Sequence, residues 1–547
     1  MGDPGLGHFR PPDPYNEPVR SYAPGSAERS SLKTRLADLT DAGTEIPMVV
    51  GGEHRSGRES GAIRAPHRKE LVIGRYAVGG AEDVGAAIDA ALEAHRGWAA
   101  TPYSERAAVF LRAAGLLAGP YRDTLNAATM LGQSKTAHQA EIDAAAELID
   151  FWRYNVHYGD QLLAQQPSND RTAWNRLEYR PLEGFVFAVT PFNFTSIMGN
   201  LPTAPALMGN TVVFKPATQT LLAAHFLMEL LAEAGLPPGV INLVSGPATE
   251  IAGQVLSHER LAGIHFTGST GVFNGMWEQV GGRIASYRTY PRLVGETGGK
   301  DFVIAHESAD EVALRTALVR GAFEYQGQKC SAASRAYVPR SMWERMRAEL
   351  VDEVEGIAMG DVADFRNFMG AVIDEKAFRK HSEAIAFARA AGDGTRVVAG
   401  GETDSDAGWF VRPTVIETSD PDFRLLKEEL FGPILTVHPY ADGRFGEALD
   451  LVDRTSPYGL TGAVFARDRA AISQAHEVLR NAAGNFYVND KPTGAVVGLQ
   501  PFGGARASGT NDKAGSQLNL IRWVSPRVIK ETFVPATDYR YPFMTEE

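Results

Sequence analysis

Cys330 is the single cysteine of the chain, and its surroundings favour nucleophilic chemistry. It lies in the stretch FEYQGQKCSAAS, where Gly327 and several small residues predict an accessible turn that leads into a helix. Backbone amides and a helix N-terminus at this point would lower the pKa of the thiol and stabilise the thiolate. A lone cysteine is more often an inert, buried apolar residue. The context, rather than the residue type, therefore predicts a catalytic thiol.

Three further polar residues end or follow short apolar runs. Glu296 lies among glycines in VGETGGK, which suits a positioned general base with space beside it. Asn193 in PFNF is a neutral donor between aromatic residues and could stabilise an oxyanion. Lys215 in VVFKPA ends a predicted strand where a phosphate or a ribose could bind. Each signal alone is weak, because a single Glu or Lys is usually a solvated surface charge.

Short apolar runs alternate with helical patterns through the middle of the chain. The runs at 185–194, 210–217, 240–246 and 261–269 end in polar or small residues, and 220–235 has helical spacing. This alternation predicts parallel strands with helices on both faces of the sheet. It restarts after about residue 290, so we expect two α/β halves. Ligands bind such sheets beyond the carboxyl ends of the strands.

Composition excludes several classes of protein. The 547 residues include 54 basic and 66 acidic ones, and a net charge of −12 argues against a nucleic-acid-binding protein. No apolar run is long enough to cross a membrane. One cysteine permits no intramolecular disulfide, which fits a reducing compartment. The N-terminal stretch lacks the apolar core of a signal peptide, so we expect a cytoplasmic protein.

Generic motifs do not explain the chain. GETGGKD resembles a phosphate-binding loop, but Val294 stands where the first Gly is needed and Asp301 replaces Ser or Thr. TGSTG is not a nucleophile elbow, because Thr267 replaces its first Gly. The histidines show no metal-binding spacing, and we expect no metal site.

Seven motifs in order resemble the aldehyde dehydrogenase superfamily over nearly the whole chain. They are PFNF, VVFKPA, FTGS, GETGGK, GQKCSA, EELFGP and PFGGARASGT. The resemblance implies an α/β fold with two doubly wound domains and a small β oligomerisation flap. Two longer stretches, FNFTSIMGNLPTAPALMGNTVVFKPA and TGAVVGLQPFGGARASGTNDKAG, are most similar to the branch that oxidises glutamate γ-semialdehyde. Thr297 departs from the general family, which usually carries Leu after the base.

The resemblance implies NAD-dependent oxidation of L-glutamate γ-semialdehyde to L-glutamate in proline degradation. Cys330 would be the nucleophile, Asn193 the oxyanion donor and Glu296 the base that activates water. A relative that acylates coenzyme A would lack that base. For NAD, the implied residues are Lys215 and Glu429 at the ribose hydroxyls, Ser269 after Gly268 near the pyrophosphate, and Phe431 beside the nicotinamide.

The resemblance also assigns the substrate site. Ser331 and the backbone of Gly494 and Ala495 would surround the α-carboxylate, because glycine lets amides approach an anion closely. Two aromatic side chains would enclose the aliphatic stem, and one helical carboxylate would lie near the ammonium group. These residues are Phe194, Phe502 and Glu147. For Glu147, a surface salt bridge is nearly as good an interpretation.

The predicted organisation has four parts, and a homodimer or higher homo-oligomer is expected because the flap would pair with a second subunit. A proline dehydrogenase is a possible partner. Two alternatives remain open: an aldehyde dehydrogenase for another semialdehyde, and a non-catalytic binding protein of the same fold. The choice between NAD and NADP also remains open. The parts are an N-terminal arm, 1–39; an NAD-binding domain, 40–165 and 186–295; a catalytic domain, 296–496; and the flap with the C-terminal segment, 166–185 and 497–547.

Overall fold

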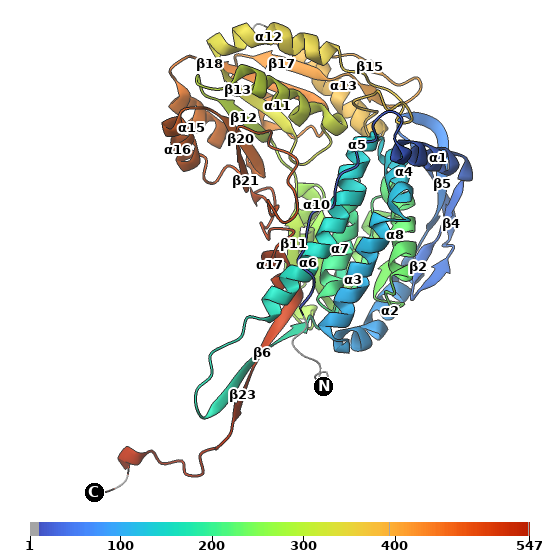
Figure 1. Cartoon of the computed structure of the whole chain (residues 1–547), viewed down its shortest axis with the longest axis vertical. Helices are drawn as coiled ribbons and strands as arrows, with labels where there is room; N and C mark the ends of the chain where they lie inside the picture. Colours follow the sequence, from blue (N-terminus) through green and yellow to red (C-terminus); the bar gives the residue numbers. More distant parts are fainter. Residues whose placement is uncertain (1–9, 393, 545, 547) are drawn as a thin grey trace.

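Two seven-stranded sheets, both covered by helices, make up the body of the computed structural model, which describes residues 10–392, 394–544 and 546 (Figure 1). The first sheet has the order β11-β10-β7-β8-β9-β2-β3, with β10, β7, β8, β9 and β11 parallel. Its strands are β2 (Met48–Val50), β3 (Glu53–Arg55), β7 (Phe185–Val189), β8 (Thr211–Lys215), β9 (Ile241–Leu243), β10 (Leu261–Thr267) and β11 (Arg292–Glu296).

Both faces of this sheet are buried, which explains the unbroken apolar runs in its sequence. In β7, Phe185 and Phe187 pack into one core and Val186 and Ala188 into the other, as alternation along a strand requires. One core is covered by α2 (Ala81–Ala100), α9 (Ala248–Ser257) and α10 (Thr270–Gly282), and the other by α3 (Tyr103–Ala118), α4 (Arg122–Gln133), α6 (Leu148–Leu163), α7 (Thr195–Leu207) and α8 (Leu221–Glu233).

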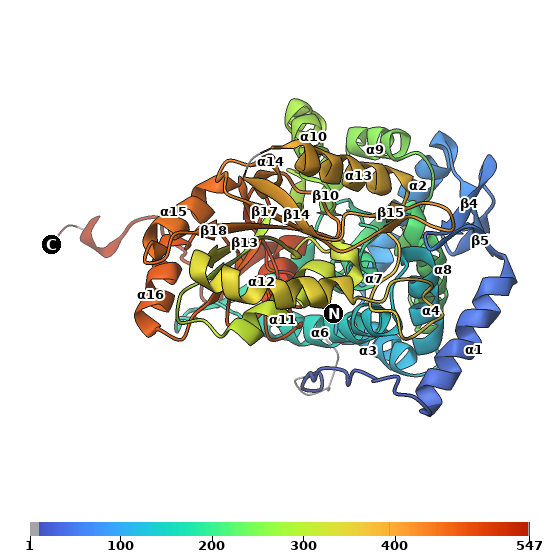
Figure 2. The ribbon, with the colours of Figure 1, turned by 90° about the horizontal axis from the view of Figure 1, so that it is seen from above.

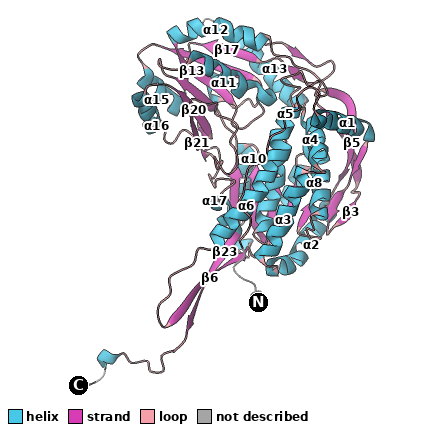
Figure 3. Ribbon diagram, in the orientation of Figure 1, coloured by secondary structure: helices cyan, strands magenta, loops and turns pink. Residues whose placement is uncertain are grey.

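The second sheet has the order β14-β17-β18-β13-β12-β20-β21 and is parallel except for β14 at its edge. Figure 3 shows its strands between layers of helices. The strands are β12 (Asp301–Ala305), β13 (Ala333–Pro339), β14 (Thr395–Ala399), β17 (Thr414–Thr418), β18 (Ile434–Tyr440), β20 (Thr461–Phe465) and β21 (Asn485–Val488). The helices are α11 (Glu311–Phe323), α12 (Arg340–Glu355), α13 (Glu375–Ala390), α15 (Phe445–Thr455) and α16 (Arg469–Val478).

A two-stranded antiparallel ribbon, here called the flap ribbon, extends away from the body, and the C-terminal segment continues beyond it (Figures 1 and 3). It pairs β6 (Ala173–Pro181) with β23 (Val524–Thr532), which lie in the two segments predicted to form the flap. Trp174 and Val528 are exposed on it. Its pairing with a second subunit stays a prediction. Among the described residues, no helix is long and apolar enough to cross a membrane.

Between residues 27 and 78 the chain forms a helix and a small sheet that were not predicted from the sequence. Helix α1 (Ala27–Ala42) lies beside α4 at the rim of the molecule (Figure 2). A small sheet of order β1-β5-β4 follows, formed by β1 (Thr44–Ile46), β4 (Glu59–Ala65) and β5 (Arg68–Val78). The predicted domain boundaries stay a proposal, supported by the division of most strands between two sheets on either side of residue 296.

Candidate active site

The first sheet brings four of the predicted site residues to one edge. Strands β7 and β10 are neighbours although β8 and β9 lie between them in the chain, so the connections run in opposite directions from this point. Such a switch point opens a crevice at the carboxyl ends of the strands. Asn193 follows β7, Gly268 and Ser269 follow β10, and Glu296 pairs with Thr267 at the end of β11. Only residues 297–300 separate Glu296 from the second sheet.

Cys330 lies in a turn between the 3₁₀ segment Glu324–Gly327 and strand β13. The expectation that this turn leads into a helix is wrong, because the following residues form a central, buried strand of the second sheet. Tyr325 and Gln326 have left-handed backbone, with φ of 51° and 55°. The Asn193 side chain donates to the carbonyl of Gln328 over 3.1 Å, which places the predicted oxyanion donor beside the cysteine turn.

The environment of Cys330 also differs from the expectation. Burial, followed by the carboxylates of Asp301, Glu296 and Glu429, raises the pKa of the thiol well above its usual value. The predicted lowering is therefore wrong, because the turn enters a strand rather than a helix and burial outweighs the effect of the backbone amides. Cys330 is thus a protonated thiol at neutral pH in this form of the site and needs a base before it can attack.

Glu296 is the candidate for that base, because its charge is among those that raise the pKa of the Cys330 thiol. It is half-buried, and its Oε2 accepts the backbone N–H of Gly504 over 3.2 Å. Burial raises the pKa of this carboxyl well above its usual value, while the nearby Lys513 opposes the shift. Lys513 is itself held by the carbonyls of Gly484 and Gly503, at 2.8 and 3.0 Å. A carboxyl with a raised pKa is a stronger base once it has lost its proton.

The glycines after Glu296 allow a second carboxylate to come close. The N–H of Gly299 donates to Oε1 of Glu429 over 2.9 Å. A Cβ on Gly298 would lie 2.4 Å from the other oxygen of Glu429, so a larger residue there would displace this carboxylate. Phe431, with a φ of 59°, packs edge-on against Phe192 at 5.6 Å between ring centres. Glu429 and Phe431 line one small cavity together with Gly299, and their roles at a cofactor stay a prediction.

The remaining residues predicted to hold a dinucleotide fit one. Ser269 caps the N-terminus of α10 and is exposed, so the first amides of that helix face the switch point and suit a pyrophosphate. A Cβ on Gly268 would lie 2.6 Å from the Phe266 ring. Lys215 is buried at the end of β8, and burial lowers the pKa of its amine. Its Nζ donates to the Pro216 carbonyl over 3.2 Å, which leaves donors for ribose hydroxyls.

The predicted carboxylate site is also brought together. Ser331 is buried directly after Cys330, and its Oγ donates to Oγ1 of Thr493 over 2.8 Å. Thr493 begins an exposed loop, residues 493–500, which we call the anchor loop. Gly494 is left-handed in this loop, with a φ of 92°, and Ala495 follows it. Ser331, next to the cysteine, therefore contacts the first residue of the anchor loop.

The two aromatic residues come from different elements. Phe194 is the residue before α7, immediately after Asn193. Phe502 exchanges backbone hydrogen bonds of 3.0 and 2.7 Å with Ala514, in the segment that also presents Gly504 to Glu296. Their enclosure of a substrate stem stays a prediction.

Glu147 ends a π-helical segment, η1 (Glu141–Glu147), that runs directly into α6. Its Oε2 accepts from Ser196 Oγ over 2.9 Å, so the alternative of a surface salt bridge is wrong. Burial, and then the neighbouring Asp143, raises the pKa of Glu147 to about 8. Single π-helical turns inside α-helices frequently occur at functional sites.

Sequence reasoning missed a buried ion pair beside these residues. Lys135 and Asp143 are 2.5 Å apart, and both are buried. Asp143 accepts the backbone N–H groups of Thr195 and Ser196, at 3.0 and 2.9 Å, and so caps α7. The Lys135 Nζ lies 4.4 Å from the ring centres of both Phe194 and Tyr325. Nothing in the sequence distinguishes this Lys from a surface residue.

No cluster of three or more His, Cys, Asp or Glu side chains that could hold a metal ion is found in the described part of the chain.

Known proteins resemble this chain over nearly its full length. The model of the aldehyde dehydrogenase family matches residues 54–526. The mitochondrial delta-1-pyrroline-5-carboxylate dehydrogenase of Dictyostelium discoideum is 48% identical over 540 residues, covering 98% of this chain and 96% of that protein.

Solved structures agree. The delta-pyrroline-5-carboxylate dehydrogenase from Mycobacterium tuberculosis, bound with NAD, is 56% identical with a TM-score of 0.95, and 99% of this chain and 100% of that chain are covered. Proline utilization A from Bdellovibrio bacteriovorus is 29% identical with a TM-score of 0.90, and this chain, covered to 99%, spans 55% of it. The predicted fold class is confirmed.

Proposed function

This chain belongs to the aldehyde dehydrogenase family, and from that premise we propose that it is an NAD-dependent dehydrogenase of L-glutamate γ-semialdehyde. This aldehyde is the open form of 1-pyrroline-5-carboxylate, the compound for which the relatives are named. The product is L-glutamate, and the reaction belongs to proline degradation. The observation that carries the proposal is the meeting of Cys330, Asn193 and Glu296 where the two sheets join.

The first step forms a bond between sulfur and the aldehyde carbon. Glu296 takes the thiol proton of Cys330, and the thiolate attacks the carbonyl. The electron pair of the C=O bond moves to oxygen, which the Asn193 side chain stabilises by donating to it. That donor has to leave the Gln328 carbonyl or share its hydrogens, because its Nδ2 bonds that carbonyl in the free site.

The second step is oxidation. Bound NAD would supply the acceptor for the hydride that leaves the substrate carbon. The oxyanion re-forms a C=O bond, so Cys330 now carries a thioester. Lys215 and Glu429 would hold the ribose hydroxyls of the cofactor, and Ser269 and the N-terminus of α10 would hold its pyrophosphate.

Hydrolysis releases the product. Glu296 first releases the thiol proton to solvent and then takes a proton from water, and the water oxygen bonds the thioester carbon as the C–S bond breaks. The carboxylic acid formed in this way loses its remaining proton to solvent, so the products are a carboxylate and the Cys330 thiolate. The raised pKa of Glu296 makes it an effective base for this step.

The charged end of the substrate provides selectivity. Ser331 and the backbone of Gly494 and Ala495 bind the α-carboxylate, and Phe194 and Phe502 enclose the stem. Glu147 binds the ammonium group. Glu141 is paired with Arg122 and Asp143 with Lys135, so Glu147 is the carboxyl group of η1 left for a ligand cation. Buried polar groups of this kind reject aldehydes that lack their partners.

We also propose that the protein works as a homodimer through the flap ribbon, β6 and β23. A functional link to a proline dehydrogenase is part of the same proposal, supported by the similarity to proline utilization A. The cytoplasmic location stays a prediction, and the relative from D. discoideum carries the word mitochondrial in its name.

The test is NADH formation by the purified protein with 1-pyrroline-5-carboxylate. Succinic semialdehyde and propionaldehyde are the competing substrates, NADP is the competing cofactor, and Cys330→Ala is the control for nucleophilic catalysis. We expect the highest kcat/KM with 1-pyrroline-5-carboxylate and NAD, and no turnover by Cys330→Ala. A higher kcat/KM with another aldehyde would overturn the substrate assignment, and no turnover with any aldehyde would favour a binding protein of the same fold.

A further inference from the structure

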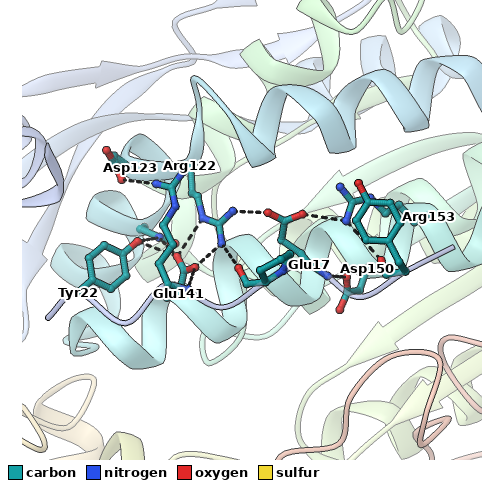
Figure 4. A network of polar contacts seen from close by, with 11 residues as sticks. Glu17, Tyr22, Arg122, Asp123, Glu141, Asp150 and Arg153 are labelled. Atoms are coloured by element: carbon teal, nitrogen blue, oxygen red, sulfur yellow. Dashed lines mark hydrogen bonds and ion pairs between the residues drawn. The ribbon is translucent and has the colours of Figure 1, made fainter. Parts of the chain in front are cut away.

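The described part of the N-terminal arm, from residue 10, does not hang free but runs over the body of its own chain. Arg122 on α4 is buried and pairs with two carboxylates, Glu17 of the arm and Glu141 of η1 (Figure 4). Glu17 also pairs with Arg153 on α6 at 2.9 Å. Tyr22 donates to Glu141 over 2.8 Å. A fully paired buried network of this kind holds the arm in one position.

One arm residue reaches further than this network. The Nδ2 of Asn16 donates to Oδ2 of Asp150 and to the carbonyl of Val497, both over 2.8 Å. The backbone N–H of Glu17 donates to the other oxygen of Asp150 over 2.7 Å, and Tyr154 donates to Oδ1 of Asn16 over 3.1 Å. Asn16 is therefore fixed from both sides, and its second amide hydrogen is directed at Val497.

Val497 belongs to the anchor loop, whose tip is open to solvent. Gly494 and Leu499 are exposed, whereas Val497 is 6% exposed. The loop is tied at its start by the hydrogen bond between Ser331 and Thr493. Farther along, Gly498 packs so closely on Tyr154 that a Cβ would lie 2.3 Å from the ring. The bond from Asn16 to Val497 is the tie that the arm supplies, three residues after Gly494.

We propose that Asn16 is a positioning residue for substrate binding, because it fixes the anchor loop in the shape that holds the substrate carboxylate. This inference rests on the proposed function of Gly494 and Ala495. Loss of the tie leaves the loop free to move, so part of the binding energy for the carboxylate goes into ordering it. The chemistry at Cys330 is untouched, since Asn16 makes no contact with the cysteine turn among its described bonds.

Two variants of the full chain test this, Asn16→Ala and the isosteric Asn16→Asp, which lacks the donor. Glu17→Gln is the matched control, because it weakens the ion pairs of the arm and leaves the Asn16 amide in place. We expect KM for 1-pyrroline-5-carboxylate to rise about 3- to 10-fold in both Asn16 variants, the range for one hydrogen bond. Their kcat, and their kcat/KM with propionaldehyde, stay within about twofold of wild type. Glu17→Gln keeps the wild-type KM.

Hydrogen exchange of the free enzymes provides a readout that does not depend on turnover. Amides of residues 496–500 exchange faster in Asn16→Ala and Asn16→Asp, and at the wild-type rate in Glu17→Gln. Unchanged KM and exchange in both Asn16 variants would overturn the inference alone. Equal losses with both aldehydes, or the same KM rise in Glu17→Gln, would also overturn it, since the arm would then act on the whole site. A wild-type protein that does not oxidise 1-pyrroline-5-carboxylate would overturn the proposed function as well.

Discussion

At the scale of single residues, the protein makes its nucleophile and its base hard to ionise and places them together. Cys330 and Glu296 both have raised pKa values, and each carboxylate near the sulfur strengthens the shift of the thiol. Poor solvation disfavours the charged form of both groups. A thiol held in its protonated form reacts slowly with alkylating agents.

The reactivity of Cys330 should therefore depend on pH in a defined direction. Only the thiolate reacts, and its pKa is raised, so alkylation by iodoacetamide in the free enzyme rises with pH beyond the range in which an ordinary thiol titrates. The measurement is the alkylation rate between pH 6 and 10, with Cys330→Ala as the blank. A rate that reaches its plateau below about pH 8 would show a lowered pKa and contradict the structure.

Glu296→Gln separates the two halves of the reaction. Water activation for hydrolysis needs the carboxylate, so the thioester accumulates and steady-state kcat falls about 100- to 10,000-fold. Slow formation of the first thiolate is still possible with hydroxide at high pH. Rapid mixing at pH 9 should then show one NADH released per active site before the slow phase. A linear trace without this burst would mean that Glu296 limits the attack rather than the hydrolysis.

At the scale of elements, the strands were predictable and the strained turns were not. Phe185–Val189 and Leu261–Thr267 are strands because both faces are buried, and an unbroken apolar run reports that directly. The turn at Tyr325 and Gln326 is left-handed with side chains that rarely adopt it, so only packing of the whole site accounts for it. The pattern around Cys330 therefore suggested a helix where the chain enters a strand.

The same limit applies to the polar core. Asn193, Glu296 and Cys330 could be found because each lies in a short motif at the end of an apolar run. Lys135 lies in the short link between α4 and α5 (Ala137–Ala140) and Asp143 lies in η1, two places where charged residues are normally solvated, and their pairing depends on the π-helical turn of η1. The Asn16 contact with Val497 joins residues 481 positions apart, and no local pattern encodes such a contact.

The buried ion pair of Lys135 and Asp143 leads to a prediction about the stability of the fold around η1. Lys135→Met leaves Asp143 buried without its cation, and breaking one side of such a pair costs about 3–5 kcal/mol. We expect a clear fall in melting temperature and in the free energy of unfolding by denaturant. The double variant Lys135→Met/Asp143→Asn should recover part of that loss, because no unpaired charge remains. Equal stability of wild type and Lys135→Met would show that Asp143 finds another partner.

At the scale of the whole molecule, separate segments hold the two sheets together around the site. Residues 297–300 connect them directly, and the arm reaches the anchor loop. The turn between β4 and β5 is a third link, with hydrogen bonds from Lys69 to Ala407 and from Trp409 to Pro66, at 2.9 and 3.0 Å. The relative position of the two sheets thus depends on contacts between segments distant in sequence. The flap ribbon takes no part in these contacts and extends away from the body (Figure 1).

The flap ribbon exposes apolar residues, and a two-stranded ribbon alone is only marginally stable in water. Contact with a second subunit would bury these residues and stabilise the ribbon. Val528 on β23 is 68% exposed, whereas Val312 on α11 is 61% exposed and lies on the body. If the flap ribbon joins two subunits, Val528→Lys shifts the equilibrium between dimer and monomer toward monomer, and Val312→Lys does not. Light scattering after size exclusion, over a range of protein concentrations, measures this directly. Equal masses for both variants and wild type would contradict the predicted role of the flap ribbon. A Val528→Lys monomer that keeps the catalytic activity would show that each subunit carries a complete site.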